Sequence, residues 1–578
     1  MKKLLFIILA FSYTQIHAQG TWTPLNNKIP YINGGVMEML LLTDGTVMAK
    51  TDSIANNQLG TGMWSKLTPD SQGSYVNGTW SNLATMSKNR LYFSSQVLQD
   101  GRVLIIGGEN GNGTTTAEIY DPLTNAWTLL HPPGGIGTVY LDGNSEILPD
   151  GRVLVSRFHG SSFAQTEIYN PVLNTWTGGP TSVGNSDESA WLKLPDNSIL
   201  FVAMGTRNSE RYIPSLNQWR KDDSVPVSLY DPFGYEAGPS FLLPDGRGFF
   251  IGSLPYTTYY TPSGDTTKGT WAAGPPIPNG EGVPDGSGAM MVNGKILIAF
   301  SPAADSAHHF PTPSTFYEFD YLTNTYTQIL APDGLDTLKG RTADIMMLDL
   351  PDGTILYGNQ SSSQCYVYTP DGTPLAAGKP TINNITQSGC TFTITGTLFN
   401  GISAGVSYGD DWQMTTNRPI IRLQAGTNVY YARCFNWNRT GVQTGTLPDT
   451  AEFTMPAGLP SGGYSLVVTA NGIASDSVHF NYTACSAGIA EVGVVNDALT
   501  AYPNPANDQI TIAYKAKTTG NYKIKIVDII GRTVIEASDI AIAGNNFHEI
   551  DLNGINSGSY LLSVQQGASI SYLKILVK

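Results

Sequence analysis

The sequence predicts an all-β protein whose largest part is a seven-bladed β-propeller, and a repeated turn signal is the first reason. A turn pair of the Asp-Gly type recurs seven times, at intervals of 46 to 59 residues. The pairs begin at Asp44, Asp100, Asp150, Asp196, Asp245, Asn293 and Asp352. Each pair links two apolar runs. The pair predicts a tight hairpin turn between them, because Asp-Gly and Asn-Gly tolerate the positive φ angles that this turn requires. Every copy therefore starts with a strand, a turn and a second strand.

A second signal follows the hairpin in most copies. An aromatic residue precedes another by seven positions, and an Asn-containing turn lies between them. The pairs are Tyr120 and Trp127, Tyr169 and Trp176, Tyr212 and Trp219, and Phe319 and Tyr326. The apolar alternation on both sides predicts a third and a fourth strand, with the tryptophans as packing residues. Four-stranded units repeated about every 50 residues are typical of a β-propeller, and a plain sandwich would not need such regular spacing.

The closure of the ring has two candidate segments. Residues 21–25, TWTPL, resemble a last strand and would let the N-terminal segment complete the seventh sheet. Residues 373–380, TPLAAGKP, are the alternative. The sequence does not choose between them.

The rest of the chain divides at changes of composition. Lys2, Lys3 and an apolar stretch before Ala18 predict a signal peptide at 1–18. The propeller is expected over 19–378 and an immunoglobulin-like sandwich over 379–484, where short alternating strands replace the Asp-Gly rhythm. A linker at 485–499 precedes a small β-sandwich at 500–578.

Composition restricts the partners. A net charge of -14 argues against nucleic-acid binding, which requires a basic surface. No apolar run after the signal peptide approaches the length of a membrane span. Four cysteines, Cys365, Cys390, Cys434 and Cys485, allow three disulfide pairings in an oxidising compartment, and all three stay open.

The last segment carries a specific resemblance. It contains Tyr502-Pro503-Asn504-Pro505, Gly531-Arg532, Ser557-Gly558-Ser559-Tyr560 and a terminal Lys578. In these motifs it closely resembles the type A C-terminal sorting domain of the type IX secretion route. The resemblance implies export across the outer membrane of a Gram-negative cell, with the secretion machinery as partner, the tail usually removed, and a secreted or surface-attached product.

Residues 90–128 and 408–423 resemble the galactose oxidase and glyoxal oxidase group, which joins a seven-bladed kelch propeller to an immunoglobulin-like domain. Of that family's copper-radical residues, only the cross-linked tyrosine has a counterpart, at Tyr92. Its cysteine partner corresponds to about Glu38, and the axial tyrosine and first histidine ligand correspond to Ala343 and Asp344. Residues 433–437 of the last domain, where the comparison would place a further ligand, contain no histidine. The resemblance therefore implies the fold without standard oxidase activity, and copper is unexpected because carboxylates select harder ions.

Acidic residues recur where the first strand of each copy begins, six to nine residues before its turn. Six of the seven copies have an acidic residue there, and the second copy has a tyrosine. The positions are Glu38, Tyr92, Asp142, Glu188, Glu236, Asp285 and Asp344. They are expected at one mouth of the central channel, on the face opposite the turns. Connections on the same face contain His131, His159, His308 and His309, together with Arg90, Arg157, Arg207, Trp64 and Tyr256.

Carboxylate, imidazole, guanidinium and aromatic groups around one opening are the composition expected of a sugar or metal site. The candidate ligand-binding residues are Glu38, Arg90, Tyr92, Asp142, Glu188, Glu236, Asp285, His308, His309 and Asp344. Clustered carboxylates would repel each other without a counter-ion, so the sequence admits Ca²⁺ at this mouth. The alternative is that the acids only cap strands and solvate the mouth.

Three functions are consistent with these patterns. The first is glycan binding at the mouth, with Trp64 or Tyr256 stacking on a sugar ring. The second is an extracellular carbohydrate-active enzyme, either an oxidase with altered ligands or a hydrolase that uses two carboxylates, with no catalytic residue assigned. The third is an adhesion platform for a protein partner.

Overall fold

The structure is a computed structural model that describes residues 19–30, 34–51, 60–133, 138–141, 143–159, 162–407, 416–484, 499–528, 532–567 and 569–578. The chain divides into two compact units, 1–484 and 485–578. The described residues form β-strands with a few short 3-10 turns and no α-helix, which confirms the all-β prediction. They contain no helix with the length and apolar character of a membrane span. The predicted signal peptide and nearly all of the predicted linker lie outside the described residues.

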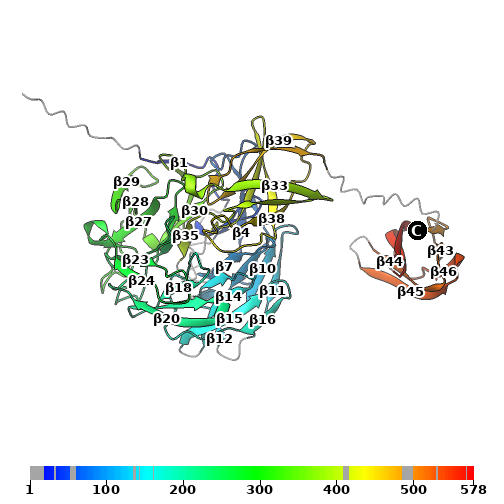
Figure 1. Cartoon of the computed structure of the whole chain (residues 1–578), viewed down its shortest axis with the longest axis horizontal. Helices are drawn as coiled ribbons and strands as arrows, with labels where there is room; N and C mark the ends of the chain where they lie inside the picture. Colours follow the sequence, from blue (N-terminus) through cyan, green and yellow to red (C-terminus); the bar gives the residue numbers. More distant parts are fainter. Residues whose placement is uncertain are drawn as a thin grey trace, which may run out of the picture. The chain divides into compact units, whose positions relative to one another are not determined.

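Seven sheets follow one another along the first unit, and most strands of each sheet are neighbours in the chain (Figure 1). The first contains β2 (Val36–Leu41), β3 (Val47–Thr51), β4 (Trp64–Thr68) and β5 (Thr79–Asn82); the second contains β7 (Ser94–Val97), β8 (Val103–Ile106), β10 (Ala117–Asp121) and β11 (Ala126–Leu130). The third contains β12 (Thr138–Val139), β13 (Ser145–Ile147), β14 (Val153–His159), β15 (Ser162–Asn170) and β16 (Thr175–Gly178). The fourth contains β17 (Leu192–Lys193), β18 (Ile199–Val202), β19 (Asn208–Ile213) and β20 (Gln218–Ser224).

The remaining sheets repeat the pattern. The fifth contains β21 (Ser240–Leu242), β22 (Gly248–Ile251), β23 (Thr257–Thr261) and β24 (Thr270–Ala273). The sixth contains β25 (Glu281–Gly282), β26 (Gly288–Met290), β27 (Ile296–Pro302), β28 (Thr315–Asp320) and β29 (Thr325–Ile329). The seventh contains β30 (Ile345–Asp349), β31 (Ile355–Asn359) and β32 (Ser362–Thr369), and a small ribbon pairs β6 (Arg90–Leu91) with β9 (Asn110–Gly111). Each sheet coincides with one copy of the repeated turn signal.

The N-terminal segment completes the seventh sheet. Strand β1 (Thr21–Pro24) pairs with β32 from Thr21 opposite Thr369 to Pro24 opposite Tyr366. Residues 373–380 do not add a strand there, because they form a turn that includes the 3-10 segment η5 (Ala376–Gly378). Strand β2 of the first sheet lies against β30 of the seventh. The sheets therefore close on themselves, and the first of the two closure alternatives is the one observed.

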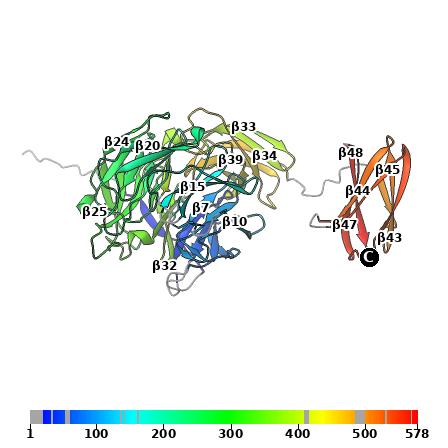
Figure 2. The same cartoon turned by 90° about the horizontal axis from the view of Figure 1, so that it is seen from below.

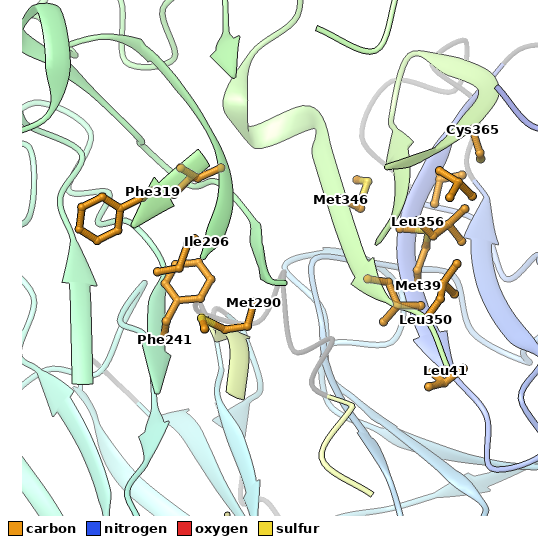
Figure 3. Packing of buried hydrophobic residues seen from close by; sticks show 14 of the residues in the cluster. Met39, Leu41, Phe241, Met290, Ile296, Phe319, Met346, Leu350, Leu356 and Cys365 are labelled. Carbon is orange, nitrogen blue, oxygen red and sulfur yellow. The ribbon is translucent and has the colours of Figure 1, made fainter. Parts of the chain in front are cut away.

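The first strands of neighbouring sheets pack their apolar side chains together. Phe241, Met290 and Met39 belong to one buried cluster that joins the first, fifth, sixth and seventh sheets (Figure 3). The recurring tyrosine and tryptophan pack on each other, and the ring centroids of Tyr169 and Trp176 are 4.6 Å apart. The repeated residues thus help to hold the sheets together, because burying large aromatic side chains is favourable.

Residues 381–482 form a further sheet assembly within the first unit. Its strands are β33 (Thr381–Ser388), β34 (Thr391–Thr397), β35 (Ala404–Ser407), β36 (Ile420–Ala425), β37 (Asn428–Phe435), β38 (Asp449–Thr454), β39 (Gly462–Ala470), β40 (Ile473–Ala474) and β41 (Val478–Tyr482). Strand β35 leaves this assembly and pairs with β21, so it extends the fifth sheet on its inner edge. The immunoglobulin-like assignment and the boundary at residue 378 stay predictions.

This assembly covers the turn ends of the seven sheets. The hydroxyl of Thr440 donates to the carbonyl of Leu148 at 3.1 Å, and the amide of Gln443 donates to the carbonyl of Leu243 at 2.9 Å. Gly45 has a φ of 73°, and a Cβ there would lie 2.5 Å from the ring of Tyr431. The opposite end of the ring, where the first strands begin, is the end on which the sequence predicts a ligand site. We call it the open face.

The second unit has its own apolar core and two sheets (Figure 2). One contains β42 (Leu499–Tyr502), β43 (Gln509–Ala516) and β46 (Gly544–Asp551). The other contains β44 (Gly520–Val527), β45 (Thr533–Ala541), β47 (Gly558–Gln566) and β48 (Ser569–Val577). The alternating apolar residues of these strands form the small sandwich that the sequence predicts.

Three cysteines are free thiols. Cys365 and Cys434 are buried and Cys390 is exposed. Burial raises the pKa of each buried thiol to about 12. The fourth, Cys485, lies outside the described residues. No pairing among the three described cysteines is therefore formed.

Candidate functional site

Residues in the left-handed backbone region mark the start of the first strands on the open face. Tyr92, Glu188 and Asp285 have φ angles of 53°, 48° and 48°. All three lie eight residues before the turn of their sheet, so the conformation recurs with the repeat. A left-handed conformation costs a side chain other than glycine on the order of 1 to 3 kcal/mol and is often found at functional sites.

An arginine and a carboxylate form a pair beside these positions. Asp344 ends the short 3-10 segment η4 (Thr342–Asp344), and its carboxylate accepts from Arg341 Nη2 at 2.6 Å and Nε at 3.2 Å. The hydrogen bond that Arg341 donates to Asp344 raises the pKa of Arg341, and the negative charges of Asp344 and Asp285 add to the rise. The guanidinium also lies 5.6 Å from the centroid of the Phe310 ring. Arg341 therefore pairs with Asp344 and interacts electrostatically with Asp285, which precedes the first long strand of the sixth sheet.

Residues 230–236, which we call the aromatic loop, lead into β21 of the fifth sheet. The buried carboxylate of Asp231 accepts the backbone N–H groups of Phe233 at 2.8 Å, Gly234 at 2.6 Å and Glu236 at 3.3 Å. The rings of Tyr230 and Tyr235 stack at 6.1 Å with an interplanar angle of 5°. These contacts hold the loop in one conformation although it has no regular secondary structure.

The aromatic loop exposes apolar surface. Of the aromatic side chains in 19–484 whose burial the structure describes, only Phe233, Tyr235 and Tyr256 are exposed, at 43%, 55% and 45%. Tyr256 belongs to the neighbouring hairpin, which Ser253 joins to the aromatic loop by donating its hydroxyl to the carbonyl of Glu236 at 2.7 Å. We call these three side chains the aromatic platform.

Two carboxyl groups on the same face have perturbed acidity. Burial raises the pKa of Asp187 to about 6, against a hydrogen bond with Asn185 that lowers it, and the Glu109 carboxylate adds to the rise. Burial also raises the pKa of Glu109. Oδ1 of Asp187 is buried and has no hydrogen-bond partner within the described part of the chain. A carboxyl group that titrates near pH 6 can hold a proton for a ligand or a reaction.

Two candidate residues from the sequence are buried away from the open face. Glu38 is 2% exposed and accepts from the Ser95 hydroxyl at 2.9 Å, and burial raises its pKa well above the ordinary value. Arg90 is fully buried, and its Nη1 and Nη2 groups donate to carbonyls of its own loops and to Glu118. Trp64 is likewise fully buried. Trp64 is a packing residue that cannot stack on a ligand, and Glu38 and Arg90 have no surface to offer one.

The structure brings other candidates closer together. The backbone N–H of Asp285 donates to the carbonyl of Ala237 at 3.0 Å, directly after Glu236. His309 packs against Gly234 of the aromatic loop. His308 turns to Asp305, 3.2 Å away. Asp142 lies outside the described residues.

The sequence reasoning did not select the aromatic loop or Asp187. A signal for the loop was present, since residues 230–235 read YDPFGY and place three aromatic residues in six positions without strand alternation. Asp187 directly precedes Glu188, the residue that the repeat selects in that copy. Its raised pKa depends on burial, which no sequence spacing reveals.

The candidate donors differ from those of the copper site in the family that the sequence resembles. Among the described residues, no three histidine, cysteine, aspartate or glutamate side chains are arranged to hold a metal ion. Asp344, at the position of the family's first histidine ligand, is bound by Arg341, and Glu38 is enclosed between sheets. These residues do not fit a copper-radical centre. The Ca²⁺ assignment stays a prediction.

Comparison with known proteins identifies two segments. Residues 500–578 match the secretion system C-terminal sorting domain, and residues 93–134 match the kelch motif. No curated protein matches the chain.

Solved structures resemble it at low identity. A fungal alcohol oxidase of the AA5 family in complex with copper has 14% identity and a TM-score of 0.47, over 81% of this chain and 100% of the other. A catalytically inactive virginiamycin B lyase from Staphylococcus aureus with quinupristin has 11% identity and a TM-score of 0.42, over 61% and 100%. A streptogramin B lyase has 12% identity and a TM-score of 0.41, over 61% and 98%. None of these similarities supports a function for this chain. By its matched segments, the protein contains a kelch motif and a secretion system C-terminal sorting domain, and it is secreted or attached to the cell surface.

Proposed function

We propose that the open face binds glycans, and the observation that supports this most strongly is the aromatic platform. Phe233, Tyr235 and Tyr256 leave apolar ring faces in water, although aromatic side chains normally gain free energy from burial. Rings held by a rigid loop can stack on the C–H face of a sugar at little entropic cost.

Polar groups beside the platform complete such a site. Glu188, Glu236 and Asp285 each precede the strand before a repeated turn, in three successive sheets and on the same face. A carboxylate accepts hydrogen bonds only, so it suits sugar hydroxyl donors. A mostly apolar surface with a few convergent polar groups is typical of a small-molecule site.

Replacement of Tyr235 by alanine should weaken glycan binding about fivefold, because stacking between rigid rings contributes on the order of 1 kcal/mol beyond area burial. A glycan array identifies the ligand, and calorimetry with that ligand measures the change. Tyr572→Ala is the matched control, since Tyr572 lies in the second unit and is 53% exposed. The proposal is wrong if no glycan binds. If a protein partner binds and Tyr235→Ala leaves it unaffected, an adhesion platform is the better description.

A second candidate function is hydrolysis of a glycoside, and Asp187 favours it. A protonated carboxyl group next to an ionised one is the arrangement that acid-base cleavage of glycosides requires. Asp187 would be the general acid and Glu109 the carboxylate of the pair. Asp187 and Glu109 replace Glu38 and Asp344 as the acids to test, because Glu38 is buried and Asp344 is paired with Arg341.

Replacement of Asp187 by asparagine should lower kcat at least about 100-fold without changing the unfolding temperature, because general acid catalysis contributes factors of this size. Release of reducing ends from polysaccharides measures the rate. In the unmodified protein the rate should fall as the pH rises above about 6, because Asp187 then loses its proton. Asp305→Asn, an exposed acid on the same face, is the control. Equal rates for Asp187→Asn and the unmodified protein would rule out this role.

A further inference from the structure

One sheet of the second unit has exposed apolar side chains on its outer face. This sheet contains β45, β44, β47 and β48 in that order (Figure 2). Alternate residues of a strand point to opposite faces, and Ile575 and Val577 of β48 are buried in the core. The residues of the other face are Ile570, Tyr572 and Leu576, which are 43%, 53% and 39% exposed. Strand β48 therefore has apolar side chains on both of its faces.

The register of the sheet brings lysines to the same outer face. Lys523 shares a row of the sheet with Ile570, and Lys525 shares the next row with Tyr572. Residues directly opposite each other on paired strands point to the same side. Lys574 alternates with the exposed apolar residues of β48 and is itself exposed. The apolar row thus lies among three lysines, and we call this surface the basic face.

One acid offsets part of the charge of the basic face. Glu536 of β45 lies opposite Ile526's neighbour Lys525, and its carboxylate is 2.6 Å from Lys523 Nζ. The hydrogen bond with Lys523 lowers the pKa of Glu536, and the charges of both lysines add to this effect. Among the described residues of these four strands, three lysines and one glutamate point to this side. The face therefore has an excess of positive charge.

The other sheet of the second unit has the opposite balance. Its outer side carries Lys515, Glu549 and Asp551, which are all exposed. Residues 499–578 contain seven lysines and arginines and six acids, in a chain with a net charge of -14. Positive charge is thus concentrated on one side of one small sandwich, although the chain as a whole is acidic.

This combination of groups fits a membrane surface whose lipids carry phosphate. Lysines attract anionic headgroups, and tyrosine is favourable at the boundary between headgroups and acyl chains. Isoleucine and leucine gain free energy by entering that boundary, while lysine side chains extend back to the phosphates. Ile570, Tyr572 and Leu576 lie outside the groove that β44, β45 and β47 form on this sheet, so they project from the surface. Projecting apolar groups suit insertion into a lipid layer.

We propose that the basic face binds an anionic lipid membrane, and this inference does not depend on the glycan site. The three lysines pair with lipid phosphates while the apolar row of β48 enters the headgroup boundary. Glu536 weakens the attraction, because its carboxylate competes with the phosphates for Lys523.

Flotation of the full chain with vesicles tests the proposal. Vesicles made of equal parts of phosphatidylcholine and phosphatidylglycerol are compared with vesicles of phosphatidylcholine alone. The anionic vesicles should bind at least about tenfold more chain, because each lysine near such a surface contributes about 1 kcal/mol. Raising the salt from about 0.05 M to about 0.5 M should reduce this binding, since the charges are screened.

Variants of exposed residues locate the surface. Lys574→Gln should weaken binding to the anionic vesicles about fivefold, and Glu536→Gln should strengthen it by a similar factor. Ile570→Ser should weaken binding and leave its dependence on salt unchanged, because it removes apolar area only. Lys515→Gln makes the same change of charge on the other sheet and is the matched control, with no effect expected.

The outcomes separate the lipid from other partners. Equal binding to both kinds of vesicle, binding to neither, or equal losses for Lys574→Gln and Lys515→Gln overturns the proposal. A polyglutamate arm tests for an acidic protein instead. If polyglutamate binds, Lys574→Gln weakens it and vesicles do not bind, the basic face docks an acidic protein and the lipid assignment is wrong. None of these results bears on glycan binding, because every variant lies in the second unit.

Discussion

Replacement of Asp349 by asparagine should stabilise the first unit at pH 7 by up to about 4 kcal/mol. Asp349 ends β30, is 6% exposed, and its Oδ1 has no hydrogen-bond partner among the described residues. It lies beside Gly405 of β35, the strand that extends the fifth sheet. Burial raises its pKa from 3.8 to about 8, so the folded protein holds this carboxyl group in its neutral form at pH 7.

The direction in which the free energy of unfolding changes with pH follows from proton linkage. Between about pH 4 and pH 8 the folded chain retains a proton that the unfolded chain releases, so the free energy of unfolding falls as the pH rises. An asparagine has the shape of the neutral carboxyl group and does not titrate. The variant should therefore lose this part of the pH dependence and gain most at the alkaline end.

Urea unfolding followed by tryptophan fluorescence measures the effect. All ten tryptophans lie at or before residue 437, so the signal reports the first unit. Asp476→Asn is the control, because the exposed pair of Asp476 and Lys379 should contribute little. A loss of stability at pH 7, or an unchanged pH profile, would show that Asp349 is ionised and paired in the folded protein.

Replacement of Arg90 by methionine should destabilise the first unit by about 3 to 5 kcal/mol, because it leaves a buried carboxylate without its partner. Arg90 Nη1 donates to the carbonyls of Gly107 at 2.7 Å, Gly113 at 2.6 Å and Thr116 at 2.9 Å. Nη2 donates to Glu118 at 3.2 Å, and both side chains are fully buried. Methionine fills a similar volume but satisfies none of these acceptors.

The same fluorescence experiment tests Arg90. Arg220→Met on the exposed strand β20 is the matched control and should cost less than about 0.5 kcal/mol. Adding Glu118→Met to Arg90→Met should recover part of the loss, because an apolar pair leaves no buried charge. A loss below about 1 kcal/mol for Arg90→Met would mean that water reaches these groups.

The sequence by itself determined the repeated strand-turn-strand pattern of the first unit and the identity of the last segment. Hairpin turns such as Asp100-Gly101 impose local backbone geometry, so their spacing fixes where paired strands begin and end. The Tyr169 and Trp176 spacing fixes which residues pack, since both positions lie on paired strands. The motifs of 500–578 are contiguous in the chain and need no tertiary contact to be recognised.

Only the tertiary structure decided which residues can meet a ligand. Glu38 and Glu236 both lie six to nine residues before the turn of their copy, yet Glu38 is a buried residue within β2, whereas Glu236 lies in the aromatic loop. The closing strand β1 and the added strand β35 pair with residues more than 150 positions away, and local patterns do not specify such partners. Burial and the resulting pKa shifts arise from these long-range neighbours, and for that reason repeat spacing could find the open face but not the groups that act on it.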